Sequence, residues 1–398
     1  MEESNKYPLG DYVKIKNGYA FKSSDFVNEG IPIIRMKDLK NGPIEIDKCV
    51  KYPFDSINKF KSYELSNGDI LIGMSGSIGK IGLIKDLKGK AFLNQRVGKF
   101  EIIDEKKLLK NFLHYILASI PYQKRLNLIA TGATQKNISS KQLESIKVHI
   151  PDIETQKKIV KTLENAEKLK EWRTEADKFP DEYLRNVFIK LFGDSRFNPF
   201  NWENNALENL IIKDSKITYG IVQPGDEFSC GVGMIRPLDF EKHEILFDKI
   251  KHIDPKIEKK YQRTKLTGKE ILITIRGSIG STCITDERCY NFNVNRDIAV
   301  IRPNEKLINI FYLNEFFKSN LATDYFREHT KGATLKGVNI KDIKALPVLI
   351  PPITLQNQFA QIVQQVETLK THQAQSKQEI DNLFNTLMQK AFKGELVC

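Results

Sequence analysis

The sequence predicts an α+β protein with two similar mixed α/β domains, separated by an antiparallel two-helix coiled coil and related as a tandem, pseudo-two-fold repeat. Three observations predict this fold. The second half of the chain repeats the first, each half opens with short apolar runs broken by glycine and asparagine, and each half closes with a heptad-patterned stretch. At 398 residues the chain is also too long for one ordinary core.

The repeat extends through the whole chain and is not confined to one motif. The tetrapeptide GSIG occurs at 76–79 and again at 277–280. The other matching segments, first copy and then second, are IPIIRMKDL (31–39) and VGMIRPLDF (232–240), LNQRVG (93–98) and VNRDIA (294–299), and TGATQKNIS (131–139) and KGATLKGVN (331–339). The stretches after Ile150-Pro151 and Ile350-Pro351 also align, so the chain is a tandem duplication.

The first part of each copy shows strand-like apolar runs. They are IPIIRM, DILIGM, KIGLI and KVHIP in the first copy and GMIRP, EILITI, DIAVI and PVLIP in the second, interleaved with helical stretches such as KNFLHYILASI. This alternation predicts a mixed α/β domain with many loops. The predicted organisation is a first domain at 1–152, a first helical region at 153–195, a second domain at 196–352 and a second helical region at 353–398.

The helical regions follow a heptad pattern in which apolar residues recur at alternating steps of three and four. The residues expected to pair the two helices are Ile159, Ala166, Leu169, Phe359, Ile362, Val366, Leu369, Ile380, Leu383 and Leu387. Pro180 falls within the first region, and proline breaks a helix interior but is tolerated in a first turn. We therefore expect one helix to end near Lys178 and another to begin at Pro180. The alternative is that the helices pack only on their own domains.

Charge is concentrated in the two domains. The net charge is +12; residues 1–150 hold 25 Lys and Arg against 16 Asp and Glu, and residues 199–350 hold 23 against 20. The two helical regions are neutral, so a polyanionic partner is expected to contact the domains. The five cysteines are scattered without CxxC spacing, which is typical of free thiols in a reducing cytoplasm and excludes a zinc-ribbon pattern. The sequence has no apolar run long enough to span a membrane and no secretory signal, and no metal site is expected.

The loop GMSGSIGK at 73–80 resembles a nucleotide-binding phosphate loop but departs from its register. Met74 stands where the first glycine of GxxxxGK belongs, and Lys80 is followed by Ile81 where Ser or Thr is needed to hold magnesium. The second copy keeps GSIG without a following lysine. A lysine required for chemistry would not be dispensable, so the repeat favours a structural or binding role over catalysis.

The side chains that recur near these loops are of the types that bind DNA phosphates and base edges. The candidates are Arg35, Ser75, Ser77, Lys80, Asn94, Gln95, Arg96, Thr134, Gln135 and Lys136 in the first copy, and Tyr219, Gln223, Arg236, Arg276, Ser278, Asn295, Arg296, Thr334 and Lys336 in the second. Each also has a structural interpretation: GSIG as a tight hairpin, Asn94 as a strand-end cap, Arg35 in an ion pair, Tyr219 in a core. Equivalent positions differ between the copies, which fits one scaffold reading two sequences.

With these motifs, the sequence resembles the specificity subunits of type I restriction-modification systems. The resemblance is carried by ITYGIVQPG, the doubled GSIG, the run from TGATQKNIS to the following long helix, FGDSRFNPFNWENNALENL at 192–210, and the closing LFNTLMQKAFKGEL. It covers the whole chain. The twofold occurrence of GATxK, an Ile-Pro, a glutamine and a long helix is its most specific part.

The resemblance implies two target-recognition domains, each reading one half of a bipartite site on double-stranded DNA, with the antiparallel helices setting the unread spacer. It also implies two modification subunits that carry S-adenosylmethionine and methylate adenine N6, together with restriction subunits that translocate and cut. Such a methylase extrudes its adenine from the duplex, so the chain itself would need neither a cofactor nor catalytic residues. Two other hypotheses stay open: a self-contained nucleic-acid enzyme using the glycine loop, and a coiled-coil scaffold that binds only proteins.

Overall fold

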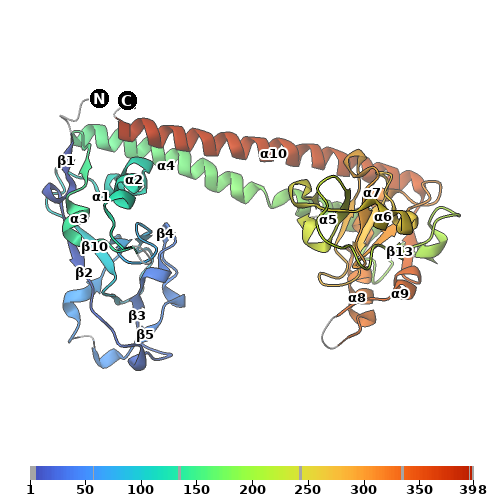
Figure 1. The fold of residues 1–398 in the computed structure, drawn as a ribbon, viewed down its shortest axis with the longest axis horizontal. Helices are drawn as coiled ribbons and strands as arrows, with labels where there is room; N and C mark the ends of the chain where they lie inside the picture. Colours follow the sequence, from blue (N-terminus) through green and yellow to red (C-terminus); the bar gives the residue numbers. More distant parts are fainter. Residues whose placement is uncertain are drawn as a thin grey trace. The chain divides into compact units, whose positions relative to one another are not determined.

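The computed structural model describes residues 6–56, 58–132, 136–241, 244–332, 336–393 and 395–396. The chain divides into two compact units (Figure 1). Unit 1 comprises Met1–Thr174 with Gln375–Cys398, and unit 2 comprises Glu175–Ala374. Each unit therefore combines one mixed domain with helical segments from other parts of the chain, whereas the sequence-based division separates domains and helices.

Unit 1 is built on a five-stranded sheet of order β2-β10-β7-β8-β4, a four-stranded sheet of order β5-β3-β9-β6, and the pair β1-β11. Its strands are β1 (Tyr7–Pro8), β2 (Val13–Asn17), β3 (Ile31–Ile34), β4 (Gly42–Pro43), β5 (Lys51–Tyr52), β6 (Glu64–Leu65), β7 (Ile70–Gly73), β8 (Ile81–Leu83), β9 (Ala91–Leu93), β10 (Val97–Ile102) and β11 (Lys147–Val148). Strand β7 is buried on both faces, which explains its continuous apolar run.

Unit 2 repeats this topology with the order β13-β21-β18-β19 in one sheet and β17-β14-β20 in another, beside the pairs β12-β22 and β15-β16. Its strands are β12 (Glu203–Ala206), β13 (Thr218–Tyr219), β14 (Val232–Ile235), β15 (Phe240–Glu241), β16 (Glu244–Ile245), β17 (Lys251–Ile253), β18 (Ile271–Thr274), β19 (Thr282–Ile284), β20 (Asn293–Val294), β21 (Ile298–Ile301) and β22 (Pro347–Ile350). The parallel pair β3-β9 has its counterpart in β14-β20. The predicted duplication is thus present in the strand order.

The helices also repeat. In unit 1 they are α1 (Lys110–Ala118), α2 (Ile120–Ile129), α3 (Ser140–Glu144) and α4 (Ile153–Ala176); α5 (Phe179–Phe192), α6 (Pro255–Glu258), α7 (Ile310–Phe316), α8 (Asn320–His329) and α9 (Ile340–Lys344) belong to unit 2, and α10 (Ile353–Lys393) contributes to both units. Helix α4 ends at Ala176 and α5 starts at Phe179 with the buried Pro180 in its first turn, as the sequence predicts.

Each unit contains an antiparallel pair of helix segments. In unit 1, Ile159 near the start of α4 shares a core with Met388 near the end of α10, while Lys170 forms an ion pair with Asp381 at 2.8 Å. In unit 2, α5 and α10 also run in opposite directions. The Nζ of Lys370 lies 2.7 Å from Asp181, and the ring centroids of Phe188 and Phe359 are 5.5 Å apart. The fold class predicted from the sequence is confirmed.

The buried face of the helices departs from the predicted heptad seam. Ile159, Ala166, Phe359 and Val366 are buried as expected, and Ile362, Ile380 and Leu387 are partly buried. Leu169, Leu369 and Leu383 are instead exposed, at 41%, 49% and 47%. An α-helix drifts by about 20° per heptad against a strict seven-residue repeat, so the contact face moves off these leucines. In unit 1 it moves to Met388 and Ala391, which pack on the domain.

A buried glutamine fixes the start of each long helix. Gln156 and Gln356 are both fully buried, and the amide nitrogen of each donates to the carbonyl of the proline five residues earlier, Pro151 at 2.8 Å and Pro351 at 2.7 Å. Their side-chain oxygens accept from backbone amides at the start of an earlier helix, Leu109 N before α1 for Gln156 at 2.9 Å and Asn309 N before α7 for Gln356 at 2.8 Å. This contact explains why Ile-Pro is followed by a glutamine in both copies.

Replacing Gln356 with Leu is expected to lower the free energy of unfolding of unit 2 by about 2 kcal/mol, because the partly buried amide of Asn309 and the carbonyl of Pro351 both lose their partner. The matched control is Gln364→Leu, since Gln364 is exposed on the same helix and its replacement should change stability by less than about 0.5 kcal/mol. Urea unfolding of both variants measures the difference. Equal losses would show that the buried hydrogen bonds of Gln356 contribute nothing specific.

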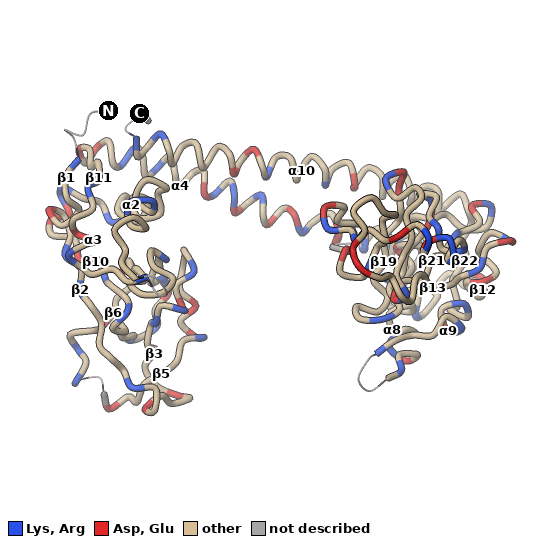
Figure 2. Tube along the Cα trace, in the orientation of Figure 1, with Lys and Arg blue, Asp and Glu red and all other residues tan. Residues whose placement is uncertain are grey.

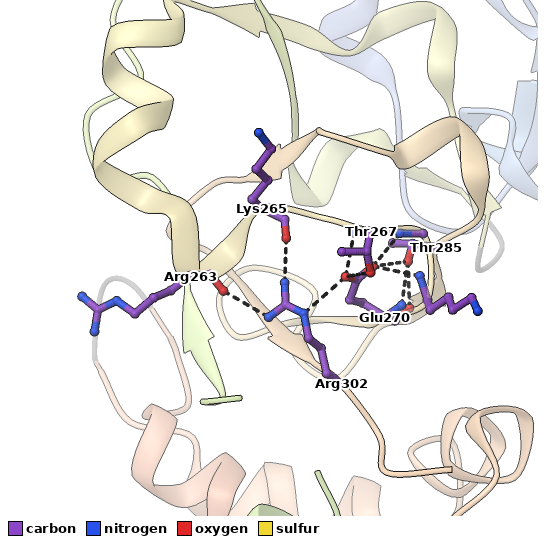
Figure 3. A network of polar contacts seen from close by, with 8 residues as sticks. Arg263, Lys265, Thr267, Glu270, Thr285 and Arg302 are labelled. Carbon is purple, nitrogen blue, oxygen red and sulfur yellow. Dashed lines mark hydrogen bonds and ion pairs between the residues drawn. The ribbon is translucent and has the colours of Figure 1, made fainter. Parts of the chain in front are cut away.

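The core of unit 2 also contains a buried charge (Figure 3). The carboxylate of Glu270 is fully buried and accepts hydrogen bonds from the hydroxyls of Thr267 and Thr285, both at 2.8 Å. The guanidinium of Arg302 lies 3.3 Å from Glu270 and donates to the carbonyl oxygens of Arg263 at 3.1 Å and Lys265 at 2.7 Å. Burial raises the pKa of Glu270, but these hydrogen bonds outweigh it and hold the pKa below its usual value. The network thus joins β18 and β21 to the segment before β18.

Candidate nucleic-acid interface

Three of the sequence segments that carry candidate residues meet in unit 1. The backbone amide of Met74, at the start of the glycine loop, donates to the carbonyl of Arg96 at 3.0 Å. The carbonyl of Met74 accepts from Ile138 at 3.0 Å, and Gly76 N donates to the carbonyl of Lys136 at 2.8 Å. The glycine loop, the Asn-Gln-Arg turn and the end of the GATQK segment therefore form one surface.

Unit 2 brings its corresponding segments together in the same way. Ile275 N donates to the carbonyl of Asp297 at 2.8 Å, and Val338 N donates to the carbonyl of Ile275 at 2.9 Å. Arg276 forms an isolated β-bridge with Gly337, as Ser75 does with Asn137 in unit 1. These equivalent hydrogen bonds show that the two units build the same surface from corresponding segments.

A fourth segment completes each surface, and the sequence analysis identified it in only one copy. In unit 1, Tyr19 N donates to the carbonyl of Leu93 at 2.9 Å, and Gln95 N donates to the carbonyl of Tyr19 at 2.8 Å. In unit 2, Arg296 N donates to the carbonyl of Ile221 at 2.9 Å. The half-exposed Tyr19 thus lies beside Gln95 and was not among the residues predicted from the sequence. The available signal was Gly18, which aligns with Gly220 of ITYGIVQPG.

These glycines are required by close contact. A Cβ atom on Gly18 would overlap the carbonyl oxygens of Leu93 and Asn94, and one on Gly220 would overlap the carbonyl oxygen of Val294. The residue that precedes Gly220 is Tyr219, which is exposed. The position before Gly18 is occupied by Asn17, so the two units present different side chains from equivalent loops.

Three aromatic rings pack around the half-exposed ring of Tyr19. Its ring centroid lies 4.6 Å from that of Phe60, 5.2 Å from that of Phe21 and 5.5 Å from that of Tyr63. Phe21 and Phe60 are buried, so the cluster fixes the ring of Tyr19 at low entropic cost. A rigid, half-exposed tyrosine is well suited to contact with a flat or apolar part of a ligand.

The geometry of the glycine loops argues against a phosphate loop. Gly76 and Gly79 have φ of 68° and 77°, and Gly277 and Gly280 have φ of 75° and 84°, a region that L side chains rarely adopt. The amide of Gly79 donates to the carbonyl of Gly73 at 2.9 Å, as Gly280 does to that of Thr274. Both GSIG motifs therefore form tight turns, and the amide of the last glycine in each turn bonds to the backbone of its own loop.

Two candidate arginines are held against their own domains. Arg236 donates to both oxygens of Asp239, at 3.0 and 2.9 Å, and to the carbonyl of Lys249 at 2.8 Å. The hydrogen bonds with Asp239 raise the pKa of Arg236. Arg35 lies 3.8 Å from Asp38, and its guanidinium carbon is 5.5 Å from the ring centroid of Phe26. Contact with DNA stays a prediction for both, and the ion-pair interpretation has direct geometric support.

The remaining candidates differ in accessibility. Exposed side chains are those of Ser77, Lys80, Gln95, Arg96, Lys136, Tyr219, Gln223, Arg276, Ser278, Arg296 and Lys336. Asn94 and Asn295 are partly buried, and Ser75 is buried. Thr134, Gln135 and Thr334 lie outside the described residues. Lys80 lines a cavity of about 400 Å³ together with Tyr115 of α1 and Gln389 of α10.

The two surfaces differ in charge. Lys and Arg are distributed over both units (Figure 2). In unit 1 the ion pairs among the described residues include none that involves Arg96 or Lys136. In unit 2 the carboxylate of Asp297 lies 3.5 Å from Arg276 and 3.8 Å from Arg296. An acidic group thus sits within the second surface and is absent from the same place in the first.

Among the described residues, His, Cys, Asp and Glu form no group of three or more that could bind a metal ion. Within the same part of the chain, every helix is too short or too polar to cross a lipid bilayer. The described cysteines, Cys49, Cys230, Cys283 and Cys289, are free thiols, and burial raises the pKa of Cys49 to about 12.

Comparison with known proteins identifies a consistent group of relatives. The family described as type I restriction modification DNA specificity domain matches residues 1–176 and 225–382. The EcoBI specificity subunit of Escherichia coli is 27% identical over 417 residues, covering 98% of this chain and 85% of the relative. The MjaVIII specificity subunit of Methanocaldococcus jannaschii is 33% identical over 199 residues, 49% of this chain and 47% of the relative.

Solved structures share the fold. The S subunit of a type I restriction-modification system from M. genitalium matches with a TM-score of 0.53 and 15% identity, over 97% of this chain and 95% of that one. A chain solved in work on complex assembly and conformational transition of the type I R-M system matches with a TM-score of 0.65 and 17% identity, over 98% of both chains. At these identities the likeness establishes the fold alone.

Proposed function

Because this chain belongs to the type I restriction-modification DNA specificity family, we propose that it is the DNA-recognition subunit of a type I restriction-modification complex. Each unit reads one half of a bipartite site on double-stranded DNA, and the helices set the unread spacer. The main observation behind the proposal is that both units contain the same interface. The amide of Met74 donates to the carbonyl of Arg96 in unit 1, and the amide of Ile275 donates to the carbonyl of Asp297 in unit 2. The backbone arrangement is the same, and the side chains differ.

The exposed side chains of the two surfaces fit base reading. Arginine offers a bidentate fork to guanine, whereas glutamine or asparagine does so to adenine. Unit 1 presents Gln95 and Arg96 at the turn where unit 2 presents Arg296 and Asp297. A change of side chains on a constant backbone is the simplest way for one fold to read two unrelated half-sites.

The chain has no catalysis of its own; methylation and cleavage belong to partner subunits. We propose two modification subunits, which carry S-adenosylmethionine and methylate adenine N6, and restriction subunits that translocate and cut, acting with this chain in the cytoplasm. Exposed apolar side chains on the helices suit such docking, because apolar side chains bury their area in protein contacts. They include Leu169 and Trp172 on α4 and Tyr183 and Ile189 on α5.

Exchanging residues 1–150 for the corresponding block of another specificity subunit tests the proposal. The methylated sequence should change in one half and keep the other half and the spacer, since each unit has its own core. Methylation mapped by single-molecule sequencing in a host with and without this gene measures the result. A change in both halves would contradict independent reading by the two units.

Salt-titrated DNA binding of the complex separates DNA recognition from a purely protein-binding scaffold. With about six phosphates contacted, affinity should fall roughly 10³-fold between 50 and 200 mM salt. A scaffold role predicts that DNA affinity does not depend on this chain at any salt concentration. Removing the chain from the complex provides the control.

A further inference from the structure

The turns at 94–96 and 295–297 make equivalent backbone hydrogen bonds, and their side chains have opposite charges at one position. Asn94 N donates to the carbonyl of Ile34 at 3.1 Å, and Asn295 N donates to that of Ile235 at 2.9 Å. Two residues further along each turn, the carbonyls of Arg96 and Asp297 accept from the equivalent amides that precede the glycine loops. Arg96 and Asp297 are therefore structural counterparts, one a cation and the other an anion.

Asp297 is surrounded by groups that make a carboxylate tolerable on a DNA-facing surface. Asn295 Nδ2 donates to it at 3.0 Å, while Arg276 and Arg296 lie 3.5 and 3.8 Å away. The two arginines are half exposed, and the carboxylate side chain is 28% exposed. The two cations offset the repulsion between Asp297 and DNA phosphates, and Asn295 fixes its orientation.

A carboxylate accepts hydrogen bonds and donates none, so its selectivity in the major groove is defined by chemistry. It accepts from the exocyclic amino groups of cytosine, N4, and adenine, N6, but at adenine the neighbouring acceptor N7 repels a carboxylate, which leaves cytosine favoured. Guanine presents only the acceptors N7 and O6 at its major-groove edge. An arginine has the opposite preference. Building on the proposed function, we propose that Asp297 reads a cytosine in the half-site of unit 2, at the place where Arg96 of unit 1 serves a guanine.

The competing explanation is that Asp297 only positions Arg276 and Arg296. The two roles predict different measurements. A base-reading carboxylate changes which base is preferred at one position, whereas a positioning carboxylate changes affinity for all sequences together and alters the salt dependence through the arginines.

The test is binding of the assembled complex to a DNA library randomised in both half-sites, with the wild type and the variants Asp297→Asn and Asp297→Glu. Asp297→Asn should reduce the preference for cytosine at one position of one half-site by roughly tenfold or more. It should leave the other half-site unchanged. Asp297→Glu retains a carboxylate and should keep the cytosine preference at lower affinity. The charge-matched control is Asp248→Asn, since Asp248 is exposed outside this turn and should leave all preferences intact.

The outcomes distinguish a failure of the assignment of Asp297 from a failure of the proposed function. If the wild type selects a bipartite sequence and Asp297→Asn selects the same sequence, the assignment of Asp297 is overturned and the proposed function stands. A uniform loss of affinity without a change in base preference likewise overturns it in favour of positioning. If the wild type selects no sequence in either half-site, the proposed function falls and this inference falls with it.

Discussion

Replacing Arg302 with Met is expected to lower the free energy of unfolding of unit 2 by about 3 kcal/mol, because it leaves a buried carboxylate without its cation. Glu270 is fully buried and Arg302 is only 17% exposed, so water can replace little of the lost interaction. The hydrogen bonds from Thr267 and Thr285 remain, which places the expected loss at the lower end for a broken buried pair. The carbonyls of Arg263 and Lys265 lose their donor as well.

Urea unfolding followed by tryptophan fluorescence measures this effect within one unit. The chain has two tryptophans, Trp172 in unit 1 and Trp202 in unit 2, so a Trp172→Phe background reports unit 2 alone. Arg327→Met is the matched control, because Arg327 pairs with Asp324 on the exposed face of α8 and an exposed pair contributes less than about 1 kcal/mol. Similar losses in the two variants would show that burial of the network is irrelevant to its contribution.

The same network should give unit 2 an acid-sensitive stability. The folded-state pKa of Glu270 lies below its ordinary value of 4.5, so the unfolded chain takes up the proton first as pH falls. The contribution of Glu270 is therefore complete above about pH 4.5 and is lost as pH falls through the lower folded-state pKa. Glu270→Gln should be less stable than the wild type at neutral pH, and the difference should shrink in acid. A difference independent of pH would contradict the assignment.

The fold was predictable from the sequence because its signals are local. The short apolar strands and the helix starts after Pro151 and Pro351 depend on residues close together in the chain, and the duplication appears when the two halves are compared. The break at Pro180 is also local, since proline excludes itself from a helix interior. The face on which α10 packs was not predictable to the residue. Its burial depends on the mixed domain against which Met388 lies, and no heptad pattern contains that information.

The candidate site was predicted in part, and the parts that failed are long-range. The glycine loops and the Asn94 and Asn295 turns could be found by comparing the two copies, and the structure brings them together. Tyr19 was missed because its position depends on a hydrogen bond to Leu93, far away in the sequence. Arg236 and Asp239 form an ion pair and are only three residues apart, so the sequence held a local signal for a structural role of Arg236. The alignment of the two copies already places Asp297 opposite Arg96, and the fold adds that the two residues occupy the same place in equivalent turns.

Gly18→Ala is expected to disable the reading surface of unit 1 while leaving that of unit 2 intact. The added methyl group would overlap the backbone carbonyls of Leu93 and Asn94, and backbone cannot rotate away as a flexible side chain can. The loop that carries Tyr19 must then separate from the turn that carries Gln95, breaking the two hydrogen bonds between them. Overpacking of this kind costs about 1–3 kcal/mol, and a loss of 1.4 kcal/mol in binding is tenfold in affinity.

The measurement is binding of the assembled complex to four DNA duplexes, in which each half-site is either intact or scrambled. For Gly18→Ala, discrimination between intact and scrambled versions of the first half-site should fall roughly tenfold or more, while discrimination at the second should match the wild type. Gly42→Ala is the control within the same unit, because a Cβ there meets no atom within 4 Å. Gly220→Ala should produce the mirror result, because Gly220 makes the equivalent close contact with Val294. If Gly18→Ala and Gly220→Ala weakened both half-sites equally, the two units could not be independent readers, whatever their resemblance in fold.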